Sequence, residues 1–460
     1  MYDYKIAVIG GGPAGYHAAI RASQKGAKVI LFEKDVVGGT CLNRGCIPTK
    51  TYLKTAEYIN NIKEADKRGI NVSKEISVDM KKVVEHKNGV VKTLTGGVSI
   101  LLNSNGVTVV NGEAYLKDEH TVICGENEYS AEKIILCGGS KPGKLPVEGI
   151  DREGVLNSDE ILDLTDLPEK LVIIGAGVIG CEMATAFSRF GCDVSIVEMA
   201  ERVVPMFDED VSAVIEVALK KAGVRLDLGR KVTAITDDNG NPSVRTDKEN
   251  VTGNKILVSV GRIADLSCLG NLKEKIKLNR GKIVTDDLLR TNIPNIYACG
   301  DINGKLMLAH AAYHMADIAV DNCLGKNKLC DLSVVPSCLY TIPEAASVGL
   351  TEKQAREKFG DVKIGRFNFS ANGRALAAGE KEGFVKVVAD EKYGEILGVH
   401  IVGGAATEMI AEATALISEE ITVDEANSRI IHAHPSFAEA FGEAMEDVRG
   451  TSVHLPKRRK

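Results

Sequence analysis

The distribution of apolar residues near the start of the chain predicts a strand, a helix and a second strand. Residues 5–9 are a short apolar run, and a glycine-rich turn follows them. Residues 16–25 then read as a helix, and residues 27–32 as a second strand that ends at Glu33. Strands that alternate with helices in this way are typical of α/β folds.

The same pattern occurs a second time downstream. Residues 171–174 are apolar and precede a second glycine-rich turn, a helix is predicted through Phe190, and residues 193–197 form a strand that ends at Glu198. The first glycine of the turn lies 23 residues before the acid in both copies, from Gly10 to Glu33 and from Gly175 to Glu198. The chain therefore contains an internal repeat of one supersecondary unit.

Each copy has the spacing of a dinucleotide-binding turn. The first glycine allows the sharp bend, the second lets the backbone approach a pyrophosphate, and the third lets the helix pack on the strand. The acid at the end of the second strand accepts a hydrogen bond from a ribose hydroxyl. The alternative is a pair of glycine-rich turns in ordinary strand–helix units. The residues of the pattern are Gly10, Gly12, Gly15 and Glu33 in the first copy, and Gly175, Gly177, Gly180 and Glu198 in the second.

The second site is predicted to take NAD rather than NADP. The Glu198 carboxylate would repel the 2′-phosphate of NADP, which pairs with arginine in sites that bind it. Arg202 lies four residues further along the chain, which weakens this argument without reversing it.

Composition and charge point to a multidomain protein without a polyanionic partner. The chain has 460 residues, enough for about three domains. It carries 57 basic and 63 acidic residues, for a net charge of −6, whereas nucleic-acid binders usually present a basic face. The one basic cluster of the sequence is the tail 457–460. No apolar run reaches the ~18 residues that a membrane span needs. The chain is expected to begin directly with a strand, without a targeting segment before it. We therefore expect a cytoplasmic protein that binds neither nucleic acid nor membrane.

Two of the eleven cysteines, Cys41 and Cys46, follow the first repeat about one helical turn apart. Gly38 and Gly39 allow a tight turn before them, and a helix N-terminus there would stabilise a thiolate. Zinc would need two more ligands at matching spacing, and a structural disulfide is unfavourable in a reducing compartment. Two inert thiols are the alternative to a redox-active pair that opens and closes by thiolate exchange. Pro48 is expected to bend or end this helical segment.

Near the C-terminus, His434 and Glu439 lie where a loop enters a helix, with Pro435 and Ser436 expected in its first turn. An imidazole with a carboxylate a few residues away can act as a general base with an orienting partner. The alternative is a surface histidine at a helix end. The other cysteines and histidines show no ligand spacing, so no metal site is predicted.

The segment from Gly39 to Lys50 resembles the signature of the FAD-dependent pyridine-nucleotide disulfide oxidoreductases. Residues 258–262, 291–301, 341–349 and 432–439 resemble other motifs of this family, so that the resemblance spans essentially the whole chain. It implies an α/β fold with two Rossmann-like dinucleotide-binding domains, one for FAD and an inserted one for NAD, and a C-terminal α+β dimerisation domain. The implied bounds are 1–146 and 266–335 for the FAD-binding domain, 147–265 for the NAD-binding domain, and 336–460 for the dimerisation domain.

The resemblance also implies roles for single residues. Cys41 and Cys46 would form the redox-active disulfide, with Cys46 next to the flavin, and His434 with Glu439 would form the catalytic base pair. Because the histidine of this family reaches the disulfide of the other subunit, the protein would be an obligate homodimer. The residues implied to bind FAD or NAD are Gly10, Gly12, Gly15, Glu33, Lys50, Gly112, Ser140, Asp301, Met307, Leu308, Ala309, His310, Gly175, Gly177, Gly180, Glu182, Glu198, Val232 and Gly261.

Within the family, the His-x-His-Pro sequence at 432–435 and the segment 307–310 are similar to the branch that oxidises dihydrolipoamide. The implied reaction oxidises a dihydrolipoyl group on another protein and reduces NAD+ by way of FAD. That partner would be the lipoylated E2 protein of a 2-oxo acid dehydrogenase or the H protein of glycine cleavage. The alternatives are an NAD(P)H-dependent reductase of another small disulfide, glutathione-like or mercuric, and a non-catalytic flavoprotein scaffold.

Two positions depart from the family pattern. Arg44 lies between the cysteines, where a small apolar residue is usual, and it either favours a thiolate or points to solvent. Cys137-Gly138-Gly139-Ser140 replaces the usual Ala-Thr-Gly-Ser, which leaves the FAD contacts at this turn open.

Overall fold

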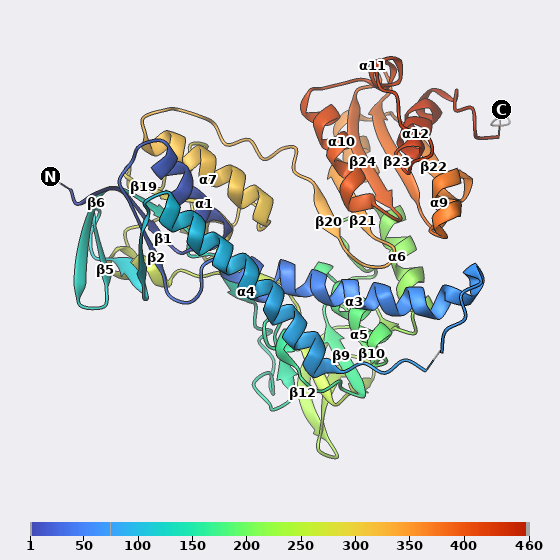
Figure 1. Cartoon of the computed structure of the whole chain (residues 1–460), viewed down its shortest axis with the longest axis horizontal. Helices are drawn as coiled ribbons and strands as arrows, with labels where there is room; N and C mark the ends of the chain where they lie inside the picture. The colour runs from blue at the N-terminus through green and yellow to red at the C-terminus, as the bar shows by residue number, and fades with distance from the viewer. Residues whose placement is uncertain (1, 74, 457–460) are drawn as a thin grey trace.

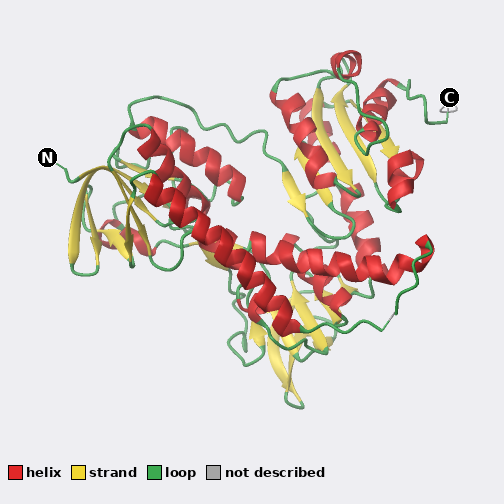
Figure 2. Cartoon of the chain, viewed as in Figure 1, coloured by secondary structure: helices red, strands yellow, loops and turns green. Residues whose placement is uncertain are grey.

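The computed structural model describes residues 2–73 and 75–456, which form three units (Figures 1 and 2). The sheet of the first unit has the strand order β3-β2-β1-β6-β5-β4, and β19 also pairs with β6. The second half of β6 pairs in parallel with β1 and β19, and its first half pairs antiparallel with β5. The strands are β1 (Tyr4–Ile9), β2 (Val29–Glu33), β3 (Thr108–Asn111), β4 (Ala114–Leu116), β5 (Thr121–Cys124), β6 (Asn127–Leu136) and β19 (Ile296–Ala298).

The parallel strands of this sheet are apolar on both faces because both faces are covered. Ile6 and Val8 pack among the helices α1 (Pro13–Gln24), α4 (Met80–Ser104) and α7 (Ala309–Cys323). Ala7 and Ile9 pack against the antiparallel extension and the short helix η3 (Ser267–Leu272). The carboxyl ends of the strands stay open between these layers, which is where α/β sheets bind their ligands.

The second unit repeats this plan. Its parallel sheet has the order β11-β10-β9-β15-β8, and a separate antiparallel sheet has the order β12-β13-β14. Leu171 and Ile173 pack on the helical side, whereas Val172 and Ile174 pack against the antiparallel sheet. The elements are β8 (Val155–Leu156), β9 (Lys170–Ile174), α5 (Val178–Phe190), β10 (Asp193–Val197), α6 (Glu209–Lys221), β11 (Arg225–Asp227), β12 (Val232–Asp238), β13 (Asn241–Thr246), β14 (Asn250–Thr252) and β15 (Lys255–Val258). The predicted internal repeat is thus confirmed, and it extends to the layers of both units.

Two connections join the first unit to the second. The strands β7 (Ser140–Pro142) and β16 (Arg262–Ala264) pair antiparallel where the chain leaves the first unit and where it returns. The long helix α3 (Cys46–Glu64) runs from the first unit across the second (Figure 1). Its Tyr52 side chain is fully buried, with ring centroids 6.3 Å from Phe187 and 5.9 Å from Phe190 of α5. The first turn of α3 is therefore held at the junction of the two units.

The third unit is an antiparallel sheet of order β20-β21-β24-β23-β22 with helices around it. Every residue of β24 is buried, so this strand forms the centre of its core. The elements are β20 (Ser337–Leu339), β21 (Ala345–Gly349), α8 (Glu352–Phe359), β22 (Val362–Asn368), α9 (Gly373–Ala378), β23 (Phe384–Asp390), β24 (Ile396–Val402), α10 (Ala406–Ser418), α11 (Val423–Arg429) and α12 (Glu439–Arg449). The predicted fold class, two Rossmann-like units followed by an α+β unit, is confirmed.

We propose the domain bounds 1–146, 147–265, 266–335 and 336–460 for the folded chain, since the β7–β16 link and the change from parallel to antiparallel pairing fall close to them. The basic tail 457–460 lies outside the described residues. Across 2–73 and 75–456, no helix combines the length and apolar character of a membrane span.

Candidate active site

The first glycine-rich turn has a backbone that only small residues can adopt. Gly10 has a φ of +101°, and a Cβ at this position would lie 2.2 Å from the carbonyl oxygen of Cys137. A Cβ at Gly15 would lie 1.7 Å from the carbonyl oxygen of Gly10. Gly12 immediately precedes α1, whose first residue is Pro13, so the N-terminal end of the helix faces the turn. This cradle suits a pyrophosphate.

The second turn reproduces this geometry. Gly175 has a φ of +106°, and a Cβ there would lie 2.7 Å from the carbonyl oxygen of Ser259. A Cβ at Gly180 would lie 2.0 Å from the carbonyl oxygen of Gly175. Gly177 immediately precedes α5. Both turns therefore fit the phosphates of a dinucleotide for the same physical reason.

The two acids of the repeat are held by equivalent hydrogen bonds. Each carboxylate accepts from one backbone N–H of its own turn and from the N–H two residues after the acid. The donors are Gly11 (2.6 Å) and Asp35 (2.8 Å) for Glu33, and Ala176 (2.6 Å) and Ala200 (2.7 Å) for Glu198. Burial raises the pKa of Glu33 above its ordinary value. Backbone hydrogen bonds thus hold Glu33 and Glu198 in the same position relative to their turns, as the predicted role of each acid requires.

A chain of hydrogen bonds lies at the open end of the first sheet. Asp301, which follows β19, accepts from the hydroxyl of Ser140. The Oγ of Ser140 also accepts from Nε of Arg262 at 2.8 Å, and Nη2 of Arg262 lies 3.3 Å from Oγ1 of Thr40. Arg262 thus links the β7–β16 connection to the segment before the cysteines. The predicted role of Ser140 and Asp301 in holding FAD fits this polar chain, whose carboxylate and hydroxyl groups could accept and donate hydrogen bonds to a ligand.

The other positions predicted to hold FAD lie beside these residues or at the start of α7. Gly112 donates its N–H to the carbonyl oxygen of Glu33 at 2.8 Å. The residues Met307, Leu308, Ala309 and His310 span the start of α7. Nε2 of His310 lies 2.8 Å from the carbonyl oxygen of Pro336, so this ring contacts the segment that leads into the third unit.

Arg202, whose position in the sequence weakened the NAD prediction, forms hydrogen bonds with other residues of the second unit. The guanidinium of Arg202 donates to Pro205 O (2.8 Å), Phe207 O (3.1 Å) and Ser212 Oγ (3.0 Å). It is therefore held by its own loop instead of being free for a 2′-phosphate. Val232 begins β12, and Gly261, with a φ of +109°, has open space where a side chain would stand.

Sequence reasoning missed Arg230 in this second unit. Its N–H donates to the carbonyl oxygen of Glu198 at 2.8 Å, and its Nε and Nη1 atoms are buried without a hydrogen-bond partner among the described residues. Unpartnered buried donors are costly. Nothing in the spacing of the glycine motif marks this residue, because it lies in the loop after β11, 32 residues beyond Glu198, and only the fold brings its backbone to that of Glu198.

Cys41 and Cys46 lie on two consecutive helices, a short one and the long helix α3. Cys41 is in α2 (Gly39–Arg44) and Cys46 is the first residue of α3. The predicted break at Pro48 is wrong, because the chain breaks at Gly45, with φ −142° and ψ −111°. Pro48 lies in the first turn of α3, where its missing N–H would have had no helical partner. Cys46 therefore occupies a helix N-terminus, a position that favours a thiolate.

In the reduced cysteine pair, a negative charge is favoured on the sulfur of Cys46 and disfavoured on that of Cys41. The Cys41 thiol hydrogen-bonds to Cys46 and, with the help of the Lys50 cation, lowers the pKa of Cys46 to about 7. The same hydrogen bond, followed by burial, raises the pKa of Cys41. Cys46 is exposed and Cys41 partly buried. The arrangement can therefore hold a thiolate on Cys46 at neutral pH.

Lys50 and Glu182, both implied by the family resemblance to lie at a cofactor, form an ion pair with each other. Lys50 Nζ lies 3.0 Å and 2.9 Å from the two carboxylate oxygens of Glu182, whose side chain is 3% exposed. Oε1 of Glu182 also accepts from the N–H of Tyr340 at 3.0 Å, and the ring of Tyr340 lies 4.4 Å below the Lys50 ammonium. One buried carboxylate thus joins α3, α5 and the start of the third unit.

Arg44 does not act on the thiols. Its guanidinium pairs with the carboxylate of Asp35, and both side chains are largely exposed. Of the two interpretations left open by the sequence, the structure favours an arginine directed to the surface.

His434 carries the hydrogen bond expected of an oriented imidazole. Its Nδ1 lies 2.7 Å from Oε1 of Glu439, and Oε2 of Glu439 accepts from the N–H of Ser436 at 2.9 Å. The prediction that Pro435 and Ser436 form the first turn of the helix is wrong, because α12 begins at Glu439. The Glu439 carboxylate instead accepts a hydrogen bond from the backbone of the loop before the helix.

The His434 side chain is 80% exposed and stands apart from the cysteines of its own chain. No hydrogen bond or ion pair among the described residues joins His434 to Cys41 or Cys46. The third unit, which carries His434, lies across from the first turn of α3 (Figure 1). One chain therefore brings the cysteines, Lys50 and the dinucleotide turns together but leaves the imidazole facing solvent.

The unusual Cys137 packs against a second cysteine. Its Sγ lies 3.5 Å from Sγ of Cys299, and both residues are buried. The contact with Cys299 and burial raise the pKa of Cys137 well above that of a free thiol. Because a thiolate is the reactive form, Cys137 is expected to be much less reactive than Cys46.

The chain matches two family models. Pyridine nucleotide-disulphide oxidoreductase matches residues 4–316, and the dimerisation domain of the same family matches residues 335–445. The dihydrolipoyl dehydrogenase of Bacillus subtilis is 40% identical over 457 residues, 98% of this chain and 99% of its own. That of Thermus scotoductus is 38% identical over 467 residues and covers 100% of both chains.

Solved structures of this family have the same fold. The HOCl-induced flavoprotein disulfide reductase RclA from Escherichia coli superposes with a TM-score of 0.88 at 28% identity, over 97% of this chain and 100% of its own. LpdA from Mycobacterium tuberculosis superposes with a TM-score of 0.89 at 26% identity, over 96% and 99%. Enzymes of this kind use FAD and NAD as cofactors, and the two dinucleotide turns fit that pair. The chain therefore belongs to the pyridine nucleotide-disulphide oxidoreductases, on their dihydrolipoyl dehydrogenase branch.

Proposed function

We propose that this enzyme oxidises the dihydrolipoyl group of a lipoylated partner protein and reduces NAD+. The observation that carries the proposal is the unequal thiol pair, in which a thiol on Cys41 donates to a thiolate on Cys46 at the N-terminus of α3. A disulfide between these residues is opened by a substrate thiolate and reformed by loss of two electrons. FAD, which the first turn at Gly10, Gly12 and Gly15 would hold, would supply the acceptor for that electron pair, and NAD+ at Gly175, Gly177 and Gly180 would be the final acceptor.

The thiol steps follow from the positions of the two sulfurs. A thiolate of the dihydrolipoyl group attacks the Cys41 sulfur, the Cys41–Cys46 bond breaks, and Cys46 leaves as the thiolate that its pKa of about 7 favours. The second substrate sulfur then displaces Cys41, which takes up a proton, and the lipoyl disulfide is released. The Cys41–Cys46 pair gains two electrons, and the dihydrolipoyl group loses two.

His434 accepts the proton that the substrate thiol loses in this scheme. Nδ1 of the imidazole is fixed by Glu439, which leaves Nε2 free to take a proton from the substrate thiol. The Glu439 carboxylate holds the imidazole in one orientation, as expected of a base with an orienting partner. His434 acts as the general base and Glu439 as its positioning partner.

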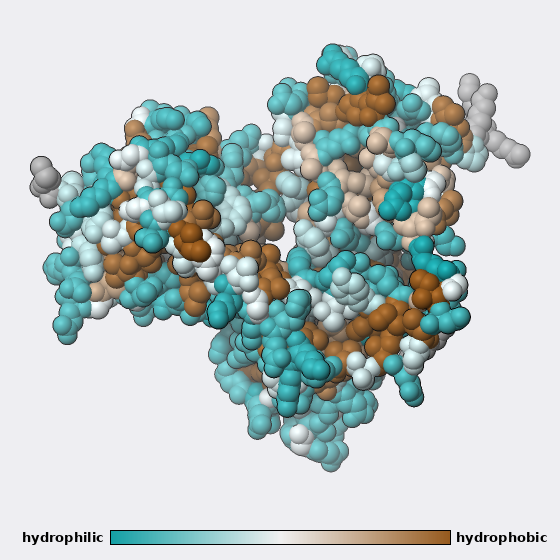
Figure 3. All heavy atoms as spheres, in the orientation of Figure 1, coloured by the Kyte–Doolittle hydropathy of each residue, from teal (hydrophilic) through white to brown (hydrophobic). Residues whose placement is uncertain are grey.

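We propose a homodimer in which His434 serves the cysteines of the other subunit. The imidazole is 80% exposed in one chain, and Ile431, three residues before it, is 97% exposed. Figure 3 shows apolar atoms gathered over α10 and α11 of the same unit. A second copy of the chain seated there covers this surface and carries the histidine to the disulfide.

We also propose NAD rather than NADP as the nucleotide. Glu198 places a carboxylate at the ribose end of the second turn, and Arg202 is held by its own loop. A 2′-phosphate there meets a like charge with no compensating cation from Arg202.

Steady-state rates test the function. The FAD-loaded enzyme is expected to turn over dihydrolipoamide with NAD+ far faster than it reduces glutathione disulfide or a mercuric salt with NADH. Cys41→Ser is expected to abolish dihydrolipoamide turnover while FAD stays bound, and Cys330→Ser, at a partly buried cysteine outside the pair, is the matched control. Turnover retained by Cys41→Ser, or a preference for glutathione disulfide, would refute the proposal.

A further inference from the structure

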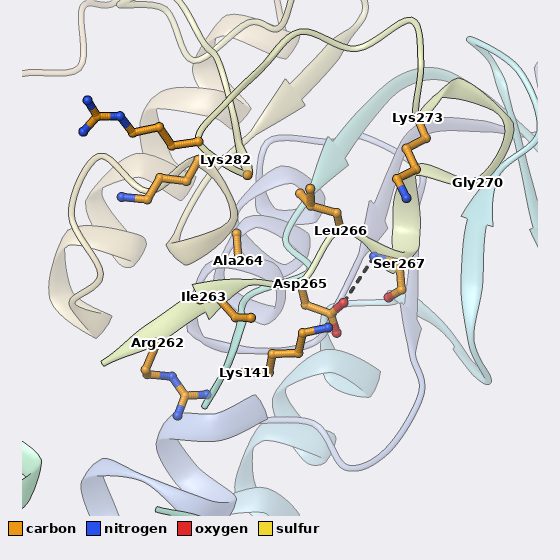
Figure 4. Close-up of a pocket in the computed structure, with 12 residues that line it drawn as sticks. Lys141, Arg262, Ile263, Ala264, Asp265, Leu266, Ser267, Gly270, Lys273 and Lys282 are labelled. Atoms are coloured by element: carbon orange, nitrogen blue, oxygen red, sulfur yellow. Dashed lines mark hydrogen bonds between the residues drawn. The ribbon is translucent and has the colours of Figure 1, made fainter. Parts of the chain in front are cut away.

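A basic pocket lies next to the β7–β16 connection, with a volume of about 630 Å³ (Figure 4). Its walls are the segment 262–267, η3, and the turn between the short strands β17 (Leu278–Asn279) and β18 (Lys282–Ile283). Of the residues discussed above with the FAD site, Arg262 also lines this pocket, and Ser140, Asp301 and the glycines of both turns do not. The cations that line it are Lys141, Arg262, Lys273, Arg280 and Lys282.

The protein balances only part of the charge of this pocket. Arg262 lies 3.8 Å from the carboxylate of Asp159, and Lys282 donates to the carbonyl oxygen of Gly304 at 3.4 Å. Asp265 is the acid in its lining, and that carboxylate already pairs with Lys34 at 3.0 Å and accepts from the N–H of Ser267 at 3.2 Å. The side chains of Lys273 and Arg280 make no ion pair or hydrogen bond with any residue in the described ranges. Several cations facing one cavity, with their acid already engaged, create a positive potential that a bound anion would neutralise.

The floor of the pocket is apolar. Ile263, Ala264 and Leu266 lie between the cations, with Lys282 on one side, Lys273 on the opposite side, and Arg262 and Lys141 on a third (Figure 4). Ile263 is 49% exposed, although it is a large aliphatic residue. The pocket has room for much more than a phosphate ion. An apolar floor within a ring of cations fits a flat base that carries a chain of phosphates.

Arg280 is held in a conformation that its side chain disfavours. It has a φ of +48° and Gly281 a φ of +75°, so the two residues form a two-residue turn between β17 and β18 with both φ positive. Turns of this kind favour asparagine followed by glycine. The arginine at the first position puts a cation at the rim of the pocket, but its positive φ raises the energy of the backbone. Backbone strain of this kind is often found at functional sites.

We propose that this pocket binds a nucleoside di- or triphosphate. The base lies on the apolar floor at Ile263 and Leu266, and the phosphates reach the cations at the edge of that floor, either Lys273 on one side or Arg280 and Lys282 on the other. This site is distinct from the two dinucleotide turns, and its existence does not depend on the function proposed above. It adjoins the first turn at one residue, Arg262, which also donates to Ser140. The test therefore uses the enzyme with FAD in place.

Fluorescence titration with N-methylanthraniloyl-ATP, on FAD-loaded enzyme saturated with NAD+, measures the binding. One saturable site per chain is expected, with ADP and ATP as competitors. The double substitution Lys273→Ala and Arg280→Asn is expected to weaken the affinity at least about tenfold, since it removes a charge-assisted contact on either side of the floor. Asparagine tolerates a positive φ, so this variant should keep its melting temperature and its flavin.

The matched control is Lys275→Ala with Lys277→Ala, which makes the same charge change in the same exposed segment without touching the pocket. Equal losses in both double variants would overturn the proposal, because nonspecific attraction would then explain the binding. If the probe bound the FAD-loaded enzyme only in the absence of NAD+, it would belong to the second turn, and if it bound only the apoprotein, it would belong to the FAD site; either result would overturn the proposal. Inorganic pyrophosphate competing as well as ADP would overturn the role of the apolar floor.

Discussion

The ammonium of Lys50 lies 2.9 Å from the carboxylate of Glu182, which ties the helix that begins with Cys46 to the second nucleotide-binding unit. The two residues are 132 positions apart. The pair places a cation one turn of helix from the thiolate and buries its counter-charge in the neighbouring unit. Both the ionisation of Cys46 and the position of α3 therefore depend on the docking of the two units.

The ionisation of Cys46 is expected to control alkylation of the reduced enzyme. Because the pKa of Cys46 is lowered to about 7, the thiolate forms as the pH rises through 7. The rate of reaction with iodoacetamide should therefore rise between about pH 6 and 8 and then level off, whereas an ordinary thiol has its midpoint near 8.5. Mass spectrometry of the labelled peptides should find Cys46 and not Cys41. A midpoint above 8.5 would contradict the thiol–thiolate description.

Lys50→Met should raise the pKa of Cys46, because it removes the cation that favours the thiolate. The alkylation rate at pH 7 should fall by about tenfold for each unit of the rise. Lys54→Met is the matched control, since Lys54 lies one turn further along the same helix and pairs with the exposed Glu57. If both variants gave the wild-type profile, Lys50 would have no part in stabilising the thiolate.

His434→Gln should lower dihydrolipoamide turnover by about 10²–10⁴-fold, the usual contribution of a general base. His432→Gln is the control, because His432 forms a similar imidazole–carboxylate pair with Glu412 at 2.9 Å in the same loop. The rate of flavin reduction by dihydrolipoamide, measured in a stopped-flow instrument, separates this effect from NAD binding. A loss of less than about tenfold would remove His434 from the mechanism.

Glu198→Gln should raise the KM for NAD+ by about tenfold or more, because it removes a charged acceptor of a ribose hydroxyl. The discrimination against NADP+ should shrink at the same time, since the repulsion of the 2′-phosphate is lost. Glu201→Gln, three residues further along and exposed, serves as the control. An unchanged ratio of kcat/KM for the two nucleotides would show that Glu198 does not select between them.

Lys386→Met should destabilise the contact between the second and third units. Lys386 is 3% exposed and pairs with Asp208 (2.9 Å), Asp210 (2.7 Å) and Glu352 (2.7 Å), of which Asp208 is itself 4% exposed. Its removal leaves a buried carboxylate without a counter-charge, which costs about 3–5 kcal/mol.

The measurement for Lys386→Met is the urea midpoint of unfolding. Lys363→Met on the neighbouring strand is the control, because Lys363 and Glu391 are each 47% exposed and such pairs contribute about 0–1 kcal/mol. Equal midpoints for the two variants would mean that the buried network does not hold the units together.

Several features of this protein follow from the sequence alone. The spacing of Gly10, Gly15 and Glu33, repeated in the second unit, determines two turns because the backbone there admits no Cβ and the acid reaches back to the turn. The neighbouring cysteines and the His434–Glu439 pair are likewise local, since the partners lie within five or six residues. Short-range geometry of this kind is encoded in residue spacing.

Other features were decided by the tertiary structure. The charge on Cys46 depends on Lys50 and on the burial of Glu182, Arg44 turns to Asp35, and Arg202 is held by carbonyl groups of its own loop. The exposure of the His434 side chain is a property of how the third unit docks. These outcomes depend on through-space distances and burial between residues far apart in the chain, and residue spacing carries no information about either.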